Sequence, residues 1–388
     1  MSPIRTVVGR VRPGHPWIFA NDILDPPVAK LVPGEQVEIV NQDGRHCGHG
    51  YANPHSLITV RMLSRTRADL DQVGFWVERL KDAAALRARV FPGRTALRVC
   101  AGEADHLGGL IIDRYDDVLV VQMTAFGIDC RADLIRAAIE KVFAPRGVVR
   151  RDDISVRAHE GLGGVSHVWW GEVPERAAFE ENGVKYAADL VGGQKTGFFF
   201  DQAENRAWMA ERVRGARVLD LYAHLGGWAL TALTHGASEA VAVDVSAAAC
   251  AQIVANGERN GVSDRLRVVT ADCKDWLREQ VEAGARFDAV CVDPPAFAKN
   301  RKSAGQALGA YKQVNQLAAQ LVVPGGLLFT SSCSHHVPWE RFEEAVYTGI
   351  RAAGRRYRRV RRGGQAADHP VLPAVPETEY LKHLVLVL

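Results

Sequence analysis

The stretch RVLDLYAHLGGW, residues 217–228, decides the fold of the C-terminal half of this chain. Its first five residues form an apolar run of strand length that carries Asp220, and Gly226 and Gly227 follow after a short loop. A strand that leads through a glycine-containing turn into a helical pattern is typical of a sheet in which strands and helices alternate. Glycine at such a turn lets the backbone approach a ligand that a Cβ atom would exclude.

The same alternation continues downstream. It predicts an α/β fold, with a parallel sheet covered by helices on both faces. Such sheets bind ligands at the carboxyl ends of their strands, which is where we look for chemistry. The strand-length runs are 217–221, 240–245, 266–269, 287–292 and 326–330, and the helical patterns are 226–235, 247–258, 275–282 and 306–321.

The N-terminal half has a different pattern of predicted secondary structure. Residues 1–70 alternate short β-like runs, such as 36–40 and 57–63, with Pro, Gly and Asn turn signals, which predicts a small β-barrel. A helix over 73–90, strands over 110–113 and 118–123, and a helix over 133–143 predict an α+β unit. We therefore expect three domains, over residues 1–70, 71–175 and 176–388.

The composition excludes several classes of protein. With 47% apolar and 24% charged residues the chain is globular, and it lacks a run of about 18 uncharged apolar residues that would span a membrane. The N-terminus has arginines but no apolar segment behind them, so we expect no signal peptide. Seven scattered cysteines without a CxxC pair predict neither a disulfide framework nor a metal site, and they favour a cytoplasmic protein.

Positive charge is concentrated in two segments. Residues 351–362 hold seven arginines and residues 1–20 hold three, and neither segment contains an acid. Such segments bind phosphate groups of nucleic acids. The excess of 38 Arg over 10 Lys is equally typical of GC-rich codon usage, so both interpretations stay open.

Four acids follow four successive strands of the predicted sheet: Asp220, Asp244, Asp272 and Asp293. Asp220 precedes the glycine loop and suits a positively charged group, Asp244 suits a ribose diol, and Asp272 suits an adenine amino group. A nicotinamide site would instead require GxGxxG for a pyrophosphate. The set predicts the S-adenosylmethionine site of a class I (Rossmann-like) methyltransferase, although each acid alone is also a common helix cap.

Cys333 follows the fifth predicted strand in the segment FTSSCSHH. A thiolate there would add to carbon 6 of a pyrimidine and make carbon 5 a nucleophile. Asp293 would hydrogen-bond the cytosine ring nitrogen or amino group. The alternative is a buried, inert thiol, which we expect for Cys47, Cys100, Cys130, Cys250 and Cys291; Cys273 would line the adenine pocket. His335 and His336 either assist Cys333 or cap the helix that begins at Pro338.

The chain resembles the large-subunit ribosomal-RNA methyltransferase I family over nearly its whole length. In the C-terminal half, the resemblance rests on GGQKTGFFFDQAENR (192–206), VLDLYAHLGGW (218–228), VDPPAFAKNRK (292–302), GGLLFTSSCS (325–334) and DHPVLPAVPETEYLKHL (368–384). Upstream, it rests on GRVRPGHPWIFANDI (9–23), NPHSLITVRMLSR (53–65) and GEADHLGGLIIDRYDDVLVVQ (102–122).

The resemblance implies an N-terminal PUA domain, a central α+β domain and 5-methylcytosine formation in 23S rRNA, with S-adenosylmethionine as donor and Cys333 as nucleophile. It also implies that the KTGFF–DQ segment, with Lys195, Thr196, Phe199 and Gln202, closes over the cofactor. The other interpretation of that segment is a hairpin with a structural aromatic cluster. The chain departs from the family at Ala203 and at Ala223-His224-Leu225, where the family carries polar residues.

Two other functions remain open at this point. One is methylation of a different RNA base, on a ring or exocyclic nitrogen, which needs no thiol adduct. The other is a non-catalytic RNA-binding or ribosome-assembly factor. Ribosomal RNA of the large subunit is the expected partner, no membrane is expected, and a homodimer is left open.

Overall fold

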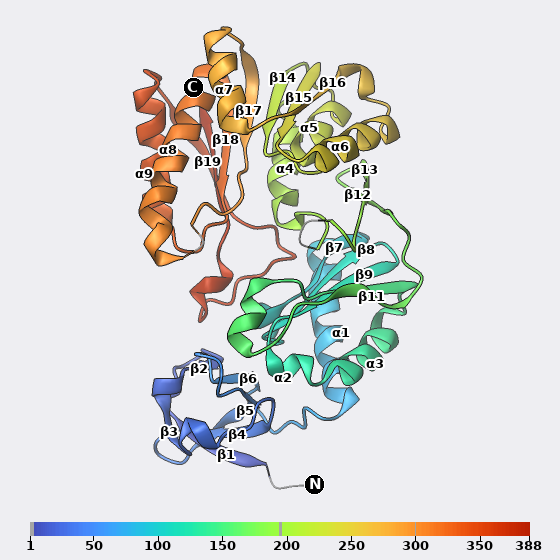
Figure 1. Ribbon diagram of the computed structural model, residues 1–388, viewed down its shortest axis with the longest axis vertical. Coiled ribbons are helices and arrows are strands. Elements are labelled where there is room, and N and C mark those ends of the chain that lie inside the picture. Colours follow the sequence, from blue (N-terminus) through green and yellow to red (C-terminus); the bar gives the residue numbers. More distant parts are fainter. Residues whose placement is uncertain (1–3, 194–195, 299) are drawn as a thin grey trace. The chain divides into compact units, whose positions relative to one another are not determined.

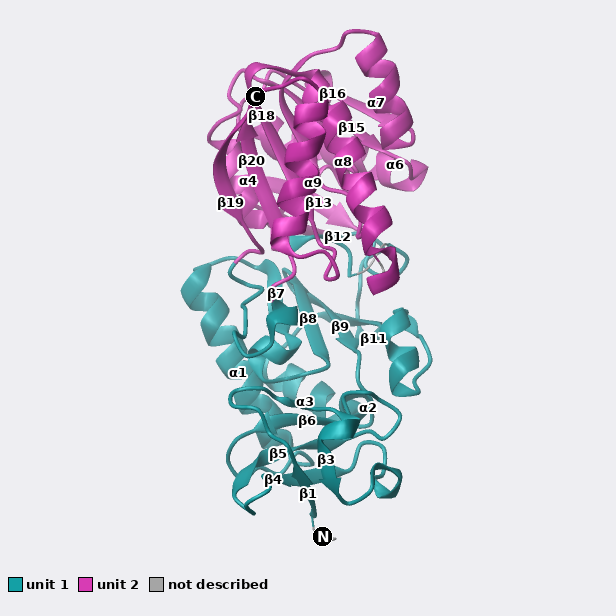
Figure 2. Cartoon of the chain, turned by 90° about the vertical axis from the view of Figure 1, so that its left-hand side faces the viewer, with its two compact units in different colours: residues 1–177, 189–200, 367–378 teal, residues 178–188, 201–366, 379–388 magenta. Residues whose placement is uncertain are grey.

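We analysed a computed structural model of the chain, which describes residues 4–193, 196–298 and 300–388. The chain divides into two compact units (Figure 2). Unit 1 comprises residues 1–177, 189–200 and 367–378, and unit 2 comprises residues 178–188, 201–366 and 379–388. The chain passes between them several times, and the three-domain division at residues 70 and 175 stays a prediction.

Unit 1 begins with a six-stranded sheet in the order β2-β6-β5-β4-β1-β3 (Figure 1). Its strands pair antiparallel except β1 and β4, which run parallel. Alternation along β4 buries Val37 and Ile39 in the core of this sheet, as the sequence pattern predicts. The strands are β1 (Arg5–Gly9), β2 (Trp17–Ile18), β3 (Ile23–Asp25), β4 (Gln36–Val40), β5 (His46–Ala52) and β6 (Val60–Ser64).

The second part of unit 1 is a five-stranded sheet in the order β11-β10-β9-β8-β7, with helices packed against it. The predicted helix over 73–90 is confirmed at both ends. One face of this helix, which includes Leu80 and Ala83, is buried. The elements are α1 (Val73–Val90), β7 (Ala96–Ala101), β8 (Leu110–Tyr115), β9 (Val118–Met123), α2 (Phe126–Asp129), α3 (Ala132–Phe143), β10 (Gly147–Arg151) and β11 (Ser166–Gly171).

Unit 2 contains a seven-stranded sheet in the order β16-β15-β14-β17-β18-β20-β19 and a two-stranded sheet, β12-β13. The strands are β12 (Ala177–Glu181), β13 (Val184–Ala188), β14 (Arg217–Leu221), β15 (Glu239–Asp244), β16 (Leu266–Thr270), β17 (Phe287–Val292), β18 (Val322–Ser332), β19 (Arg358–Gly363) and β20 (Lys382–Val387). The helices are α4 (Ala203–Ala210), α5 (Gly227–Thr234), α6 (Ala247–Arg259), α7 (Cys273–Glu282), α8 (Ala304–Leu321) and α9 (Trp339–Ala352).

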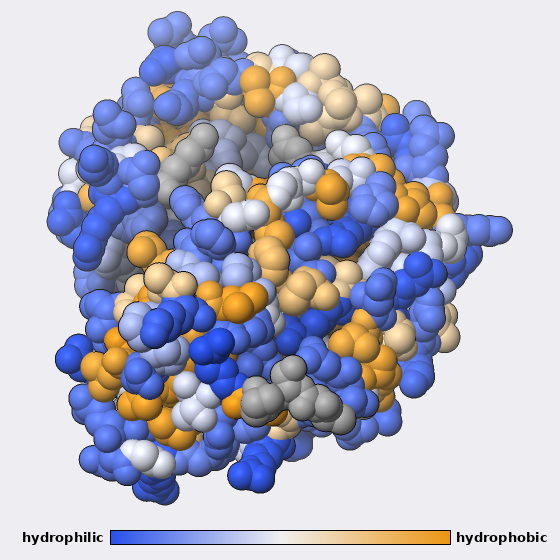
Figure 3. Space-filling model, turned by 60° about the horizontal axis from the view of Figure 1, so that its bottom comes forward, coloured by the Kyte–Doolittle hydropathy of each residue, from blue (hydrophilic) through white to orange (hydrophobic). Residues whose placement is uncertain are grey.

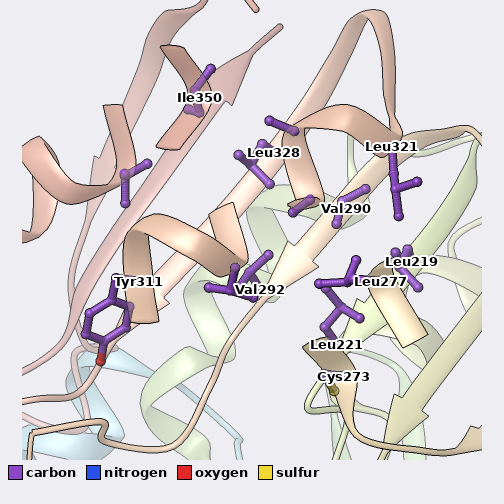
Figure 4. Packing of buried hydrophobic residues seen from close by; sticks show 14 of the residues in the cluster. Leu219, Leu221, Cys273, Leu277, Val290, Val292, Tyr311, Leu321, Leu328 and Ile350 are labelled. Carbon is purple, nitrogen blue, oxygen red and sulfur yellow. The ribbon is translucent and has the colours of Figure 1, made fainter. Parts of the chain in front are cut away.

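Helices cover both faces of this sheet, α7, α8 and α9 on one and α4, α5 and α6 on the other (Figure 1). The first face is filled by alternate residues of the strands, among them Leu219, Val290 and Leu328. Figure 4 shows Tyr311 of α8 at the margin of that cluster, with its hydroxyl oxygen turned away from the aliphatic side chains. The Tyr311 hydroxyl group therefore lies at the margin of the hydrophobic core, near the carboxyl end of β18.

The prediction of a parallel sheet is confirmed for the five strands it covered, β16, β15, β14, β17 and β18, whereas the last two strands were not predicted. Strand β20 pairs antiparallel with both β18 and β19. Strand β19 lies within the arginine-rich segment at the edge of the sheet, and its two pairs of adjacent arginines give no alternation of apolar and polar residues that would indicate a strand.

The expectation of buried thiols is correct for Cys100, Cys250 and Cys291 and wrong for Cys47 and Cys130, which are half-buried and exposed. Cys130 lies just after the short helix α2, at the surface. The surface in view in Figure 3 is mostly hydrophilic, with apolar residues scattered over it. Among the described residues, no helix is long and apolar enough to cross a membrane.

Candidate functional site

The strand order of unit 2 places the candidate residues along one edge of the sheet. Parallel strands β16, β15, β14, β17 and β18 are neighbours in that order. Because their carboxyl ends lie at the same edge, the residues that end or follow them form a row there. Along it come Asp272, Asp244, Asp220, Asp293 and Cys333.

Asp220 is fully buried one residue before the end of β14. Its Oδ2 accepts a hydrogen bond from the backbone N–H of Ala229, 3.0 Å away in the first turn of α5. Its Oδ1 is buried without a hydrogen-bond partner among the described residues. Burial raises the pKa of Asp220 to about 7, and the nearby carboxylates of Asp293 and Asp244 act in the same direction. This orphaned acceptor is suited to a cationic or hydrogen-donating ligand.

The loop between β14 and α5 has an uncommon backbone. Tyr222, His224 and Gly226 all have positive φ angles, of 61°, 53° and 78°. Positive φ angles are rare for residues other than glycine, and such residues are concentrated at functional sites. A Cβ atom on Gly226 would lie 3.0 Å from Ile253 Cγ2 of α6. Glycine is thus required here by the backbone angle and by packing against α6, rather than by ligand approach alone.

Asp244 and Asp272 accept hydrogen bonds from different parts of the backbone. Asp244, at the end of β15, accepts hydrogen bonds from the backbone N–H groups of His224 and Ser246, each at 2.9 Å. It therefore fixes the glycine loop and keeps one lone pair on each oxygen. Asp272 is exposed and caps α7, accepting from the N–H groups of Lys274 and Asp275. The capping interpretation is thus correct for Asp272, and its predicted role toward adenine stays a prediction.

Asp293 follows β17 at the centre of a polar network. Its Oδ1 accepts from Gln202 Nε2 at 3.0 Å, and its Oδ2 accepts from Trp228 Nε1 at 3.2 Å. Gln202 Nε2 also donates to Ser331 Oγ on β18, at 3.0 Å. Burial raises the pKa of Asp293 to about 6, although both side-chain donors favour the ionised form. Gln202, which the sequence assigned to the cofactor, directly contacts the predicted catalytic acid.

Cys333 is half-buried and directly follows β18. The two flanking serines are fixed by Tyr311: Ser332 Oγ donates to its hydroxyl at 2.8 Å, and the hydroxyl lies 2.9 Å from Ser334 Oγ. Ser334 Oγ also accepts from the backbone N–H of Ala298, at 3.2 Å. This network ties the Cys333 segment to the segment after Asp293, and all three hydroxyl-bearing residues are fully buried.

The histidines after Cys333 do not act as helix caps. His335 and His336 are exposed, and Pro338 is the N-cap of α9 without any side-chain cap hydrogen bond. The ring of His335 lies 5.4 Å from the ring of Tyr380. The capping interpretation is therefore wrong for both histidines.

Sequence reasoning missed Trp228 and Tyr311, which touch the predicted catalytic segments. Trp228 lies in the quoted stretch 217–228, directly after the paired glycines, and its indole stacks on His383 at 5.6 Å. A tryptophan directly after paired glycines, with an indole N–H that can donate a hydrogen bond, could have been recognised in the sequence as a candidate site residue. Tyr311 lies within a helical pattern with no local feature that distinguishes it from a core residue.

The KTGFF–DQ segment crosses from one unit to the other. Thr196 is buried and belongs to unit 1, and Phe199 is half-buried. Gln202 belongs to unit 2. Lys195 lies outside the described residues, as does Lys299 in the basic stretch after Asp293. The predicted closure of Thr196 and Phe199 over a cofactor stays a prediction.

The arginine-rich segments are partly neutralised within the fold. Arg359 pairs with Glu343 at 2.6 Å and Arg351 with Glu344 at 2.9 Å. Arg355 donates to three backbone carbonyls, one of them Val322 O. Arg361 and Arg362 lie over the indole rings of Trp208 and Trp339, at 5.3 and 4.1 Å. Arginine–aromatic pairs of this kind also stack on nucleic-acid bases.

Comparison with known protein families agrees with this architecture. The family model described as S-adenosylmethionine-dependent methyltransferase matches residues 104–344. The model described as PUA-like domain matches residues 5–65, which contain the six-stranded sheet of unit 1. The cofactor of the chain is therefore S-adenosylmethionine, as predicted, and its N-terminal sheet is a PUA-like domain.

Relatives and solved structures extend the match to nearly the whole chain. A Streptococcus mutans S-adenosylmethionine-dependent methyltransferase structure superposes with a TM-score of 0.83 at 19% identity, covering 99% of this chain and 100% of that one. A methyltransferase structure complexed with SAH gives 0.85 at 20% identity, covering all of both chains. These show the fold.

Ribosomal RNA large subunit methyltransferase I of Photobacterium profundum is 39% identical over 388 residues, covering 98% of both chains. Its Aeromonas hydrophila counterpart is 38% identical over 377 residues, covering 96% of this chain and 95% of the relative. With its sheet, its row of strand-end acids and these matches, the chain belongs to the S-adenosylmethionine-dependent methyltransferases of the ribosomal RNA large subunit methyltransferase I family.

Proposed function

We propose that this protein methylates carbon 5 of a cytosine in large-subunit ribosomal RNA through a covalent adduct of Cys333. The substrate class is supported by the names of its full-length relatives. The observation that carries the chemistry is the place of Cys333. It follows β18 at the sheet edge where Asp293 follows the adjacent strand β17, and Gln202 bridges Asp293 to Ser331 of β18.

The cofactor would be held by the acids of the same edge and by the glycine loop. Asp220 would offer the positively charged amino-acid part a buried carboxylate oxygen that has no hydrogen-bond partner among the described residues. Asp244 would offer its remaining lone pairs to the ribose hydroxyls, and Asp272 would contact the adenine. Gly226, and Thr196 and Phe199 by the family resemblance, would complete the set of cofactor residues. When bound, S-adenosylmethionine supplies an electrophilic methyl group.

The steps on the protein side require a thiolate and an acid. The Cys333 thiolate forms a bond to carbon 6 of cytosine, and the ring's π electrons make carbon 5 nucleophilic. After carbon 5 has gained the methyl group, a base removes its proton, the ring double bond re-forms, and the carbon 6–sulfur bond breaks to return the thiolate. A nitrogen methylation would need none of these steps.

Asp293 would stabilise the negative charge that develops on the cytosine ring during the addition, by donating the proton of its carboxyl group toward the ring nitrogen. Gln202 and Trp228 hold its two oxygens in a fixed orientation, so the carboxyl group reaches the ring nitrogen or the amino group with little reorganisation. The PUA-like sheet and the arginine–aromatic pairs of unit 2 supply surfaces that suit phosphates and bases.

The product distinguishes this function from its alternatives. Purified protein incubated with isotopically labelled S-adenosylmethionine and ribosomal RNA from a strain lacking the enzyme is expected to yield labelled 5-methylcytidine, identified by mass spectrometry of nucleosides. Label on a base nitrogen would overturn the proposed chemistry and favour the adduct-free enzyme. An unlabelled product together with RNA binding would favour the non-catalytic RNA-binding factor.

Asp220 predicts a pH dependence of cofactor affinity. Because its pKa in the folded protein is about 7, far above that of a free aspartate, the carboxyl group takes up a proton as pH falls through 7. An ionised Asp220 attracts the cationic cofactor and a protonated one does not, so affinity should fall about tenfold between pH 8 and pH 6. Calorimetric titration of S-adenosylmethionine over this range measures it.

The variant Asp220→Asn tests the assignment. It should bind about 10- to 100-fold more weakly at pH 8, because a charged hydrogen bond is lost, and its affinity should no longer change around pH 7. The exposed Asp264→Asn serves as the matched control and should keep the wild-type profile. An unchanged profile in Asp220→Asn would exclude Asp220 from the cofactor site.

A further inference from the structure

Lys382 is a buried lysine next to the segment that carries Cys333. It is the first residue of β20, and the antiparallel register pairs it with Ser332, the residue before Cys333. Only 4% of its surface is exposed. Lysine is almost never buried to this degree without a partner that compensates its charge.

The contacts of Lys382 leave its charge without a carboxylate. Its Nζ donates to the backbone carbonyls of Ser334 at 3.1 Å and Tyr380 at 2.8 Å. Among the described residues, no carboxylate oxygen lies within 4.0 Å of this ammonium group. The first of these carbonyls belongs to the residue directly after Cys333. The ammonium is thus anchored on the Cys333 segment and lacks an acidic counter-ion at contact distance.

We propose that Lys382 is a positioning residue for the reaction: its ammonium group supplies the charge that keeps Cys333 in the thiolate form, and its hydrogen bond to Ser334 fixes the backbone beside the sulfur. The inference rests on the proposed function, since it gives the charge of Lys382 a role only if Cys333 acts as a nucleophile. A cation close to a thiol is the usual means by which proteins favour the thiolate.

The charged and titratable groups around Lys382 agree with this role. Burial lowers the pKa of Lys382 to about 8, whereas the negative charges of Cys333 and Glu379 raise it. Lys382 is therefore mostly an ammonium at pH 7. Tyr311 faces Cys333 from α8, and burial raises the pKa of its hydroxyl group, so it stays neutral and does not compete as an anion.

Alkylation of Cys333 provides a test that is independent of methyl transfer. In the reaction with iodoacetamide, the thiolate forms a bond to carbon and iodide leaves, so the rate reports the thiolate fraction. We expect Lys382→Met to raise the pH midpoint of Cys333 alkylation by about one unit, and so to slow the reaction about tenfold at pH 7. Peptide mass spectrometry of the full chain separates Cys333 from the other six cysteines.

Two further variants complete the design. Lys382→Arg retains the positive charge and should keep most of the wild-type alkylation midpoint, whereas Lys312→Met removes an exposed lysine of α8 and should change nothing. Methyl transfer should fall at least tenfold in Lys382→Met, with a pH optimum shifted upward, and recover in Lys382→Arg. If Lys382→Met does not fold, the pH midpoint of Cys333 alkylation is compared between Lys382→Gln, which removes the charge, and Lys382→Arg, which retains it.

The results separate this inference from the proposed function. An unchanged alkylation midpoint in the neutral variants would overturn the role of Lys382. Full methyl transfer by a protein that lacks the Cys333 thiol would overturn the proposed function, whatever the alkylation midpoint shows.

Discussion

The substitution Cys333→Ala is expected to lower the rate of methyl transfer to ribosomal RNA by about 10³-fold or more. Carbon 5 of cytosine is a weak nucleophile, and the proposed addition of Cys333 to carbon 6 is what activates it. Removal of the thiol deletes that route and leaves binding and charge stabilisation in place. The measurement is single-turnover transfer of labelled methyl groups to RNA with enzyme in excess, which isolates chemistry from product release.

The loss should be confined to chemistry. Cys333 is half-buried, and its neighbours Ser332 and Ser334 are held through Tyr311 by hydrogen bonds that do not involve the sulfur. We therefore expect Cys333→Ala to keep the wild-type melting temperature and affinity for S-adenosylmethionine. Cys47→Ala, at a half-buried cysteine of the PUA-like sheet, is the matched control and should remain fully active.

A Cys333→Ala protein that retained a tenth or more of the wild-type rate would contradict the covalent mechanism. The same result with label on a base nitrogen would show an enzyme that methylates without an adduct. Trapping offers a complementary measurement: RNA that carries 5-fluorocytosine cannot lose a carbon 5 proton, so wild-type protein should accumulate as a stable protein–RNA adduct, and Cys333→Ala should not.

The sequence predicted the elements of unit 2 well, because strand and helix alternate with clear periodicity. The strands over 217–221 and 287–292 have the predicted bounds, and so does the helix over 73–90 in unit 1. The antiparallel pair β19 and β20 was missed, since four of the six residues of the edge strand β19 are arginines, which do not read as a strand.

The site was predictable to the extent that it follows from strand order. Parallel neighbours bring Asp244, Asp220, Asp293 and Cys333 to one edge, and a sequence with clear strands reveals that directly. Side-chain pairing is different, because it depends on long-range packing. Nothing local to Gln202 indicates that it joins Asp293 to Ser331, 91 and 129 residues away.

The contacts of single residues also differ in how far the sequence reveals them. Asp272 caps α7 because a helix begins immediately after it, which the local sequence already suggested, and its role toward adenine stays a prediction. Lys382 lies 49 residues from Cys333 in sequence and reaches its neighbours only through the antiparallel pairing of β20 with β18. A pattern of adjacent residues contains no information on that pairing.

Asp293→Asn is expected to lower kcat/KM for RNA methylation by about 10²- to 10³-fold. An amide cannot give the ring nitrogen the proton that a carboxyl group provides as negative charge develops on the cytosine ring. In the variant, an NH2 group replaces one of the two carboxylate oxygens that accept hydrogen bonds from Gln202 and Trp228. Because this NH2 group is itself a donor, one of those two hydrogen bonds is lost. The rate should therefore fall through chemistry and through the orientation of the network, while RNA affinity stays within a few-fold of wild type.

The pH profile separates a role in chemistry from a loss of structure. Burial raises the pKa of Asp293 to about 6, so its protonation state changes between pH 5 and pH 7 and should appear as an inflection in the wild-type profile of kcat/KM. That inflection should disappear in Asp293→Asn and persist in the exposed control Asp264→Asn. Retention of both the inflection and the rate in Asp293→Asn would remove Asp293 from the mechanism, and would leave Cys333 with Lys382 as the groups that set the reaction's dependence on pH.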